Sequence, residues 1–296
     1  MTATAARPRG TVDSSPPAGP SRAGFSRLSP RARQWAMRGI TLVLFLAVWA
    51  LITSLGLIRP LYLPSPASVW QAFVTANTDH PLAEGVDRIV RGEQNYYLWE
   101  HLLASLQRIG VGVGAAIVVG IPVGLLMSTV KWVAVVVEPY LHFLRSLPPL
   151  GYIGLLIVWF GIGDTSKIWL LFLAAFPPIA MATISGVRGV REDQINAVLS
   201  LGASRRQSVT TVMVPATLPE IITGIRVATG FAWTTVVAAE LNNGIPGIGG
   251  LAYLSGTELR TPLVVACIIV IGVAAVLLDG LLKFAERLLV PWRGKA

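Results

Sequence analysis

The sequence contains unusually few charged residues. Only 13% of its 296 residues are Asp, Glu, Lys or Arg, whereas a soluble domain carries roughly 25%. The hydrophobic share is 53% and the mean hydropathy is +0.65. So few charges cannot cover the surface of a soluble enzyme, and so much apolar content excludes a chain that is disordered throughout. The composition therefore predicts an integral membrane protein.

Residues that form disulfides or bind metals are also scarce. The single cysteine, Cys267, has no partner for an internal disulfide. The three histidines, His80, His101 and His142, lie far apart and lack the spacing of a metal site. Together with Glu138 and Asp164 they form no recognisable catalytic set. We therefore expect no catalytic residue, no metal and no directly bound cofactor.

Long apolar runs predict about six transmembrane helices in an all-α fold. A helix crosses the hydrocarbon core in about 20 apolar residues, and the alternation typical of a membrane β-barrel is missing. The third run is predicted to break at Pro148-Pro149, because proline removes a helical hydrogen bond. The predicted spans are 39–58, 109–130, about 132–160, 168–187, about 217–240 and 261–278.

The positions of the basic residues predict the orientation. Sixteen of the 24 Lys and Arg residues lie in the N-terminal tail, in the turn at Lys131, in the 186–214 loop and at the C-terminus. Five lie in the opposite loops. Because cytoplasmic loops are enriched in Lys and Arg, we expect a multi-pass protein of the cell membrane with both termini cytoplasmic. The net charge of +9 then reports orientation rather than nucleic-acid binding.

These runs divide the chain into five segments. The first is rich in Pro, Ala, Ser and Arg, which is typical of disorder. The outer loop contains Ser65-Pro66, an N-cap followed by proline at the first helical position, and this pair predicts a short interfacial helix. The segments are a disordered cytoplasmic tail (1–36), the first transmembrane helix (37–58), an extracytoplasmic loop (59–100), a permease core with its cytoplasmic loop 186–214 (101–290) and a cytoplasmic C-terminus (291–296).

The most polar part of the core, residues 190–220, predicts a helix–glycine–helix elbow. Residues 192–201 have helical periodicity, and Gly202 is placed to end that helix. Ser204 and Gln207 have the spacing of a capping box that starts a second helix. Thr217 to Glu220 forms another such box, which we expect to start the fifth span. Spacing alone leaves open whether this elbow is a docking element or an ordinary loop between spans.

This elbow resembles the cytoplasmic signature of permease subunits of bacterial ABC importers. That signature reads Glu-Ala-Ala, three residues, Gly, nine residues, Ile-x-Leu-Pro. Here Asn196-Ala197-Val198, Gly202 and Val212-Met213-Val214-Pro215 occupy its positions. Asn196 replaces the acidic residue and Val198 replaces an alanine. Residues 146–168 resemble the nitrate/sulfonate/taurine branch, and 224–240 and 288–295 are similar to taurine permeases, so the resemblance covers roughly 37–295.

The resemblance implies a type I ABC importer permease fold and a set of partners. Two copies of the permease would form the pore, two ATPase subunits would consume ATP with Mg, and an extracytoplasmic binding protein would deliver the solute. ATP binding would draw the two elbows, the coupling helices, together. The family implies lipid around the spans and no nucleic acid. The expected coupling residues are Asn196, Ala197, Val198, Leu201, Gly202, Ala203, Ser204 and Arg205.

The chain itself lacks the motif of an ATPase. The nearest approach to a phosphate-binding loop is GIGDTSK (161–167), in which Ser166 replaces the required glycine and Ile168 the Ser/Thr. We therefore expect a transport subunit without an ATPase site. The implied cargo is a small anionic or zwitterionic solute, with taurine or another sulfonate first and nitrate, bicarbonate or another small organic acid open.

Prolines and charges within the spans are candidates for the translocation path. Arg226 and Glu240 are 14 residues apart, which places them on one helix face and roughly 21 Å apart. The alternatives are that the prolines are packing kinks, that Arg226 pairs with another helix and that Glu240 lies at the outer interface. The candidate path residues are Pro148, Pro149, Arg226, Trp233 and Glu240.

Two rival functions remain at this point. A self-contained secondary transporter would work without ATPase partners and would usually show more spans or an internal repeat, and no convincing repeat is visible. A membrane-embedded enzyme would need a catalytic set. We also expect the small-residue pairs Gly110/Gly114 and Gly120/Gly124 to pack helices together.

Overall fold

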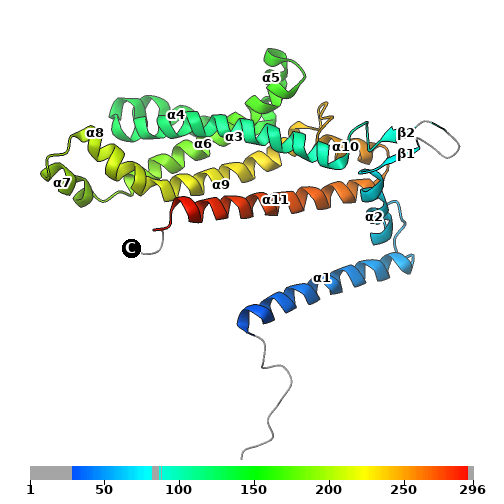
Figure 1. Ribbon diagram of the computed structural model, residues 1–296. Helices are drawn as coiled ribbons and strands as arrows, with labels where there is room; N and C mark the ends of the chain where they lie inside the picture. The colour runs from blue at the N-terminus through cyan, green and yellow to red at the C-terminus, as the bar shows by residue number, and fades with distance from the viewer. Residues whose placement is uncertain (1–28, 82–86, 88, 293–296) are drawn as a thin grey trace, which may run out of the picture. The chain divides into compact units, whose positions relative to one another are not determined.

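The computed structural model describes residues 29–81, 87 and 89–292 (Figure 1). The chain divides into two units, residues 1–51 and 52–296, and each is described by itself. The described part of the first unit consists of helix α1 (Pro30–Ser54) up to residue 51, together with residue 29. The helix begins earlier than predicted, so residues 30–36 are helical, while most of the predicted tail lies outside the described residues. The predicted C-terminus lies outside them as well, except for residues 291 and 292.

Each predicted span overlaps a helix or a bent pair of helices, although several helices extend well beyond the predicted bounds. Five helices of the described chain are long and apolar enough to cross a membrane, and a bent pair makes a sixth. The pair is α4 (Lys131–Ser146) followed by the segment Pro149–Phe160, with a 98° bend between them. The other spans are α1, α3 (Leu98–Thr129), α6 (Asp164–Arg188), the segment Arg205–Ala239 and α11 (Thr261–Leu289).

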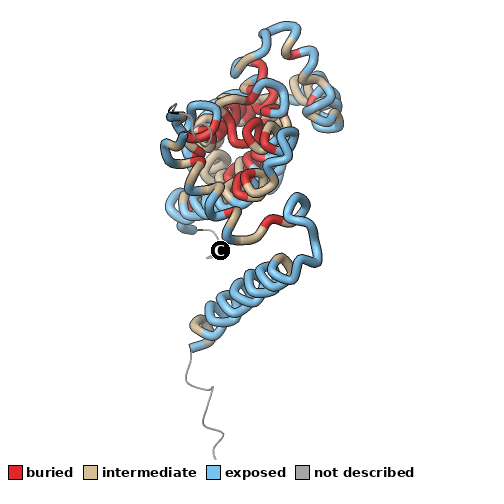
Figure 2. The backbone as a smooth tube through the Cα atoms, turned by 90° about the vertical axis from the view of Figure 1, so that its right-hand side faces the viewer, coloured by how far each residue is buried: buried red, intermediate tan, exposed pale blue. Residues whose placement is uncertain are grey.

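The core of the second unit lies among α3, α6, α9 (Val214–Ala239) and α11. In Figure 2 the buried positions follow the inside of this bundle, and the exposed ones form its outside. Glycines let α3 approach α6 closely. A Cβ atom built on Gly112 would lie 2.6 Å from the Leu171 Cβ, and one on Gly124 would lie 2.7 Å from the Ala180 carbonyl oxygen.

The predicted glycine pairs are therefore half right. Gly120 and Gly124 pack against α6, but nothing lies within 4 Å of a Cβ built on Gly110 or Gly114. Gly112, which the pairing rule did not single out, packs instead. Gly112, Ala116, Gly120 and Gly124 follow one another at intervals of four residues and are all buried, whereas Gly110 and Gly114 each lie two residues from Gly112, which is about 200° around the helix.

Short elements cover one end of the bundle, on the right in Figure 1. Ser65 caps α2 (Pro66–Thr75) by accepting a hydrogen bond from the Ser68 amide, as predicted. The outer segment also holds an antiparallel pair of strands, β1 (Asp79–Pro81) and β2 (Ile89–Arg91), with His80 opposite Val90. Helix α10 (Ile248–Thr257) lies at the same end and packs on α11.

The prediction for the start of the fifth span was wrong. Thr217 and Glu220 do not form a capping box, because the chain is already helical from Arg205 through α8 (Arg205–Ser208), a π-helical turn (Val209–Met213) and α9. An uninterrupted helix leaves no free amide for a cap to satisfy. The Thr217 hydroxyl instead donates to the Met213 carbonyl oxygen, 2.6 Å away, and Glu220 is exposed.

The close contact of α3 with α6 predicts the effect of a single methyl group. Gly124→Ala places a Cβ against the Ala180 carbonyl and should destabilise the protein by about 1–3 kcal/mol. We expect a lower thermal unfolding midpoint in detergent. Gly114→Ala, on the same helix, meets no atom and should leave the midpoint unchanged or raise it. A Gly124→Ala midpoint equal to that of Gly114→Ala would refute this packing.

Candidate functional site

The polar elbow is built from two short helices joined at a glycine. Helix α7 (Glu192–Ser200) ends as predicted, because Gly202 has a φ of +89°, a conformation that glycine adopts without strain. The Ala203 amide donates to the Val198 carbonyl oxygen at 3.2 Å and the Gly202 amide to that of Leu199 at 3.0 Å. This pair of bonds is a Schellman motif. It turns the chain sharply and satisfies the last carbonyls of α7.

The second arm of the elbow begins with the predicted capping box. The Ser204 hydroxyl accepts from the Gln207 amide at 3.3 Å, and the Gln207 side chain accepts from the Ser204 amide at 2.8 Å. Both contacts fix the direction in which α8 leaves the glycine. Since α8 continues through the π-helical turn into α9, a force on the elbow acts directly on a spanning helix.

The elbow is exposed at its tip. Figure 1 shows α7 at the end of the bundle opposite the strands, the end at which α11 finishes. Leu201 is 88% exposed although it is a large apolar residue, and a partner surface would bury it favourably. Of the predicted coupling residues, two are half-buried, Val198 and Ala203, and the others, Asn196, Ala197, Leu201, Gly202, Ser204 and Arg205, are exposed.

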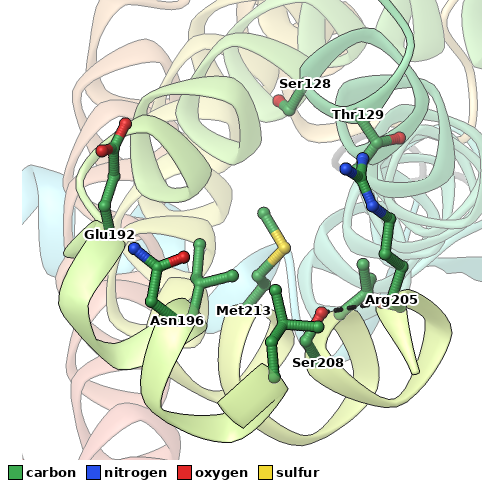
Figure 3. Close-up of a pocket in the computed structure, with 10 residues that line it drawn as sticks. Ser128, Thr129, Glu192, Asn196, Arg205, Ser208 and Met213 are labelled. Atoms are coloured by element: carbon green, nitrogen blue, oxygen red, sulfur yellow. Dashed lines mark hydrogen bonds between the residues drawn. The ribbon is translucent and has the colours of Figure 1, made fainter. Parts of the chain in front are cut away.

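A hollow of about 560 Å³ lies behind the elbow (Figure 3). Its wall combines α7, α8, the π-helical turn and the last residues of α3. In Figure 3 Arg205 reaches toward Thr129 on one side, while Glu192 and Asn196 stand on the other. The hollow separates the elbow from the end of α3.

A buried ion pair ties the helices together at the opposite end. The Arg108 guanidinium donates to the Glu240 carboxylate at 2.6 Å, to Asp164 at 2.8 Å and to the Pro246 carbonyl oxygen at 2.7 Å. Ser105 and the Gly249 amide also donate to Glu240, at 2.7 and 2.8 Å. Glu240 is fully buried and Arg108 is 3% exposed. The pair joins α3, α6 and α9 to the loop before α10.

Two further buried groups hold the same loop. His101 accepts from the Gly247 amide and contacts the Glu93 carbonyl oxygen through its other nitrogen, so the ring is a neutral Nε2–H tautomer. The Lys167 ammonium donates to the Asn243 carbonyl oxygen at 2.7 Å. Nearby, the Glu93 carboxylate binds Arg260 with both oxygens and raises the pKa of that guanidinium. The outer loop is therefore anchored at several points.

Of the other candidate path residues, Arg226 and Trp233 line one hollow, while Glu240 belongs to the buried ion pair. Arg226 is paired with Asp279 at 3.2 Å and with Glu286 at 3.0 Å on α11, and Glu240 is held by Arg108. Trp233 is 7% exposed, and its Nε1 has no hydrogen-bond partner within the described part of the chain. It lines a hollow of about 320 Å³ with Arg226. Their role in a path stays a prediction.

Pro148 and Pro149 lie at the 98° bend. Pro148 has extended backbone angles, and Pro149 begins a 3₁₀ turn (Pro149–Tyr152) that leads into α5 (Ile153–Phe160). The bend therefore has the physical cause that the sequence indicates, because two successive prolines remove two helical donors. Whether the bend lines a path also stays a prediction.

Sequence reasoning missed the Arg108 cluster. The sequence pattern singles out Glu240 but not Arg108, which binds this carboxylate from 132 residues away. Only the charges in otherwise apolar segments signalled it. Periodicity carries no information on which of the scattered charges meet.

The described fold is that of a multi-pass membrane protein with an exposed polar elbow at one end of its helical bundle. Residues 116–291 match the family described as the binding-protein-dependent transport system inner membrane component, and the chain belongs to this family of ABC transporter permeases. It is thus an inner-membrane transport subunit.

Relatives support the family over nearly the whole chain. The taurine transport system permease protein TauC of Escherichia coli (strain K12) is 40% identical over 269 residues, 90% of this chain and 93% of its own length. The putative aliphatic sulfonates transport permease protein SsuC of Bacillus subtilis (strain 168) is 32% identical, covering 89% and 90%. The nitrate import permease protein NrtB of Synechococcus elongatus is 28% identical, covering 95% and 99%.

Solved structures agree on the fold. A chain of the MetNI methionine ABC transporter in an inward-facing conformation superimposes with a TM-score of 0.53 at 22% identity, covering 67% of this chain and 97% of that one. The chain therefore has the type I ABC importer permease fold that the sequence predicted.

The buried ion pair predicts a large effect of removing its cation. Arg108→Met leaves Glu240 buried without a counter-charge and should cost about 3–5 kcal/mol. Arg91→Met breaks an ion pair with Glu100 in which Arg91 is half exposed, and should cost less than about 1 kcal/mol. Thermal unfolding of both variants in detergent checks this. Equal midpoints would show that the buried pair contributes no more than the exposed one.

Proposed function

We propose that this chain is the pore-forming permease of an ABC importer that takes up a small sulfonate or related anion. In this proposal two copies form the pore, and a binding protein delivers the solute to the outer face. Two ATPase subunits each receive one elbow in the cytoplasm and use ATP with Mg. The observation that carries the proposal is the elbow, an exposed and rigidly capped polar element in an otherwise apolar chain.

The geometry of the elbow supports docking on an ATPase. Leu201, at the tip, is 88% exposed, so a groove on the partner that takes this side chain would gain about 1.5–3 kcal/mol from its burial. The Schellman motif and the capping box hold both arms without the partner. The elbow would therefore bind with little loss of conformational entropy.

The same geometry supports transmission of movement. The second arm runs without a break into α9, while the hollow in Figure 3 separates the elbow from the end of α3. When the ATPases draw the two elbows together, α9 of each copy would be levered relative to α3. The chain would not hydrolyse ATP itself, since its nearest approach to a phosphate-binding loop lacks the essential residues.

The proposed cargo is supported by the relatives, and the proposed second copy by exposed apolar side chains. Relatives named for taurine, aliphatic sulfonates and nitrate favour a small anion or zwitterion. A second copy would cover apolar side chains such as Leu155, Val158 and Trp159 of α5, which are 48%, 80% and 65% exposed. A secondary transporter of the same fold would leave the elbow without a partner.

If the elbow docks on the ATPase, a single substitution at Leu201 should weaken binding of the ATPase to the permease. Leu201→Asp should lower recovery of the co-expressed ATPase with tagged permease at least about tenfold, as expected for an interface hot spot. Leu57→Asp, which changes a 70% exposed leucine of the outer segment, should leave recovery unchanged. Full recovery with Leu201→Asp, or stable transport without any ATPase, would reject the proposal.

The proposed orientation can be tested by labelling, because Cys267 is buried. Ser200→Cys puts a thiol on the exposed end of α7, and Thr78→Cys puts one beside β1. A membrane-impermeant maleimide should label Thr78→Cys in intact spheroplasts and Ser200→Cys only in inverted vesicles. The reverse pattern would contradict a cytoplasmic elbow.

A further inference from the structure

A groove within the spanning region contains two opposite charges. It has a volume of about 510 Å³ and is formed by the end of α4, by α6 and by α9. Arg145 lies at its α4 side and Glu220 at its α9 side. Apolar and small residues make up most of the rest: Pro178, Met181, Ala182, Gly224, Val227 and Phe231.

Neither charge is neutralised within the described chain. Glu220 makes no ion pair and no side-chain hydrogen bond there, and Arg145 contacts the Met181 sulfur at 3.6 Å. A thioether is a weak acceptor, so the guanidinium keeps most of its five donors free. This differs from Arg108 and Arg226, whose guanidiniums are bound by carboxylates. Unpaired charges on spanning helices are costly and mark functional sites.

Arg145 and Glu220 both lie against α6, at two different positions along it. Arg145 contacts Met181, and a Cβ built on Gly186 would lie 3.0 Å from the Glu220 Cβ. These two positions on α6 are five residues apart, which is about 7.5 Å along the helix axis. A solute with its charges roughly 4 Å apart, flanked by two charge-assisted hydrogen bonds of about 2.8 Å each, spans on the order of 10 Å. The axial spacing of the two contact points on α6 is of the same order as this span.

We infer that Arg145 and Glu220 form a charge-selective site in the translocation path for a small zwitterion, with Arg145 binding its acid group and Glu220 its ammonium. The inference rests on the proposed function and narrows its cargo to small ω-amino sulfonates. A site built for both charges disfavours a solute without the ammonium, because Glu220 then remains unpaired. Because Glu220 does not cap a helix, its carboxylate is available to bind the ammonium group.

The test compares two probes on the complete importer. Permease, ATPases and binding protein are reconstituted in proteoliposomes, and uptake of taurine and of ethanesulfonate is measured at saturating concentrations. Ethanesulfonate keeps the acid group and lacks the ammonium. Glu220→Gln should lower taurine uptake about tenfold, the loss expected for a hydrogen bond to a charged group, and should not lower ethanesulfonate uptake. Arg145→Gln should lower uptake of both about tenfold.

Two matched controls carry the same substitutions outside the groove. Glu138→Gln alters an exposed carboxylate of α4, and Arg188→Gln alters an exposed guanidinium at the end of α6. Both should retain the uptake of the unmodified complex. Recovery of the ATPase with each variant reports folding and assembly separately from selectivity.

The outcomes separate this inference from the proposed function. If the unmodified complex takes up taurine and Glu220→Gln lowers both probes equally or neither, the selective site is refuted while the importer stands. If the unmodified complex takes up neither probe although ATPase recovery is normal, the sulfonate cargo is wrong and the zwitterion site falls with it. If the permease recovers no ATPase at all, the proposed function itself has failed.

Discussion

The structure depends on the inability of hydrocarbon to satisfy polar groups. A chain that is 53% hydrophobic and crosses the membrane repeatedly must pair each backbone donor inside its helices, and each charge within a span needs a counter-charge or a function. Polar chemistry is therefore concentrated in a few places. Among the described residues these places include the Arg108–Glu240 pair at one end, the elbow at the other, the ion pairs of Arg226 with α11, and the groove with Arg145 and Glu220.

These sites differ in how many of their charged and polar groups have partners, and this difference suits them to different roles. Arg108 and Glu240 satisfy each other and several backbone groups, which suits an anchor for the outer loop. The elbow satisfies its own backbone but exposes Leu201, which suits docking. The groove leaves both of its charges unpaired, which suits a solute that passes through. In the proposed function, the Arg108–Glu240 pair would hold the outer end of α9 in place, so that movement of the elbow would tilt this helix.

Local features of the sequence predicted local structure well. The Ser65 cap, the glycine end of α7, the Ser204–Gln207 box and the break at Pro148 each depend on residues within one or two turns of each other. Long-range partners escaped prediction. The spacing of Arg108 and Glu240 in the sequence does not predict their contact. Glu220 has the spacing of a capping box, but the helix that precedes it is continuous, so no cap forms there. The predicted start of α1 is also too late, because its first turns carry charged residues such as Arg33 and Arg38 and the prediction followed the apolar run alone.

The central claim is that closure of the ATPases moves the two elbows, and a distance measurement tests it most directly. A spin label on Ser200→Cys in the assembled complex gives the separation of the two α7 helices by pulsed electron resonance, since the native Cys267 is buried. The account predicts one intercopy distance that becomes shorter when ATP binds in the presence of the binding protein. A distance unaffected by ATP would contradict coupling through the elbow, and the lack of any dipolar signal would contradict the pairing of two copies.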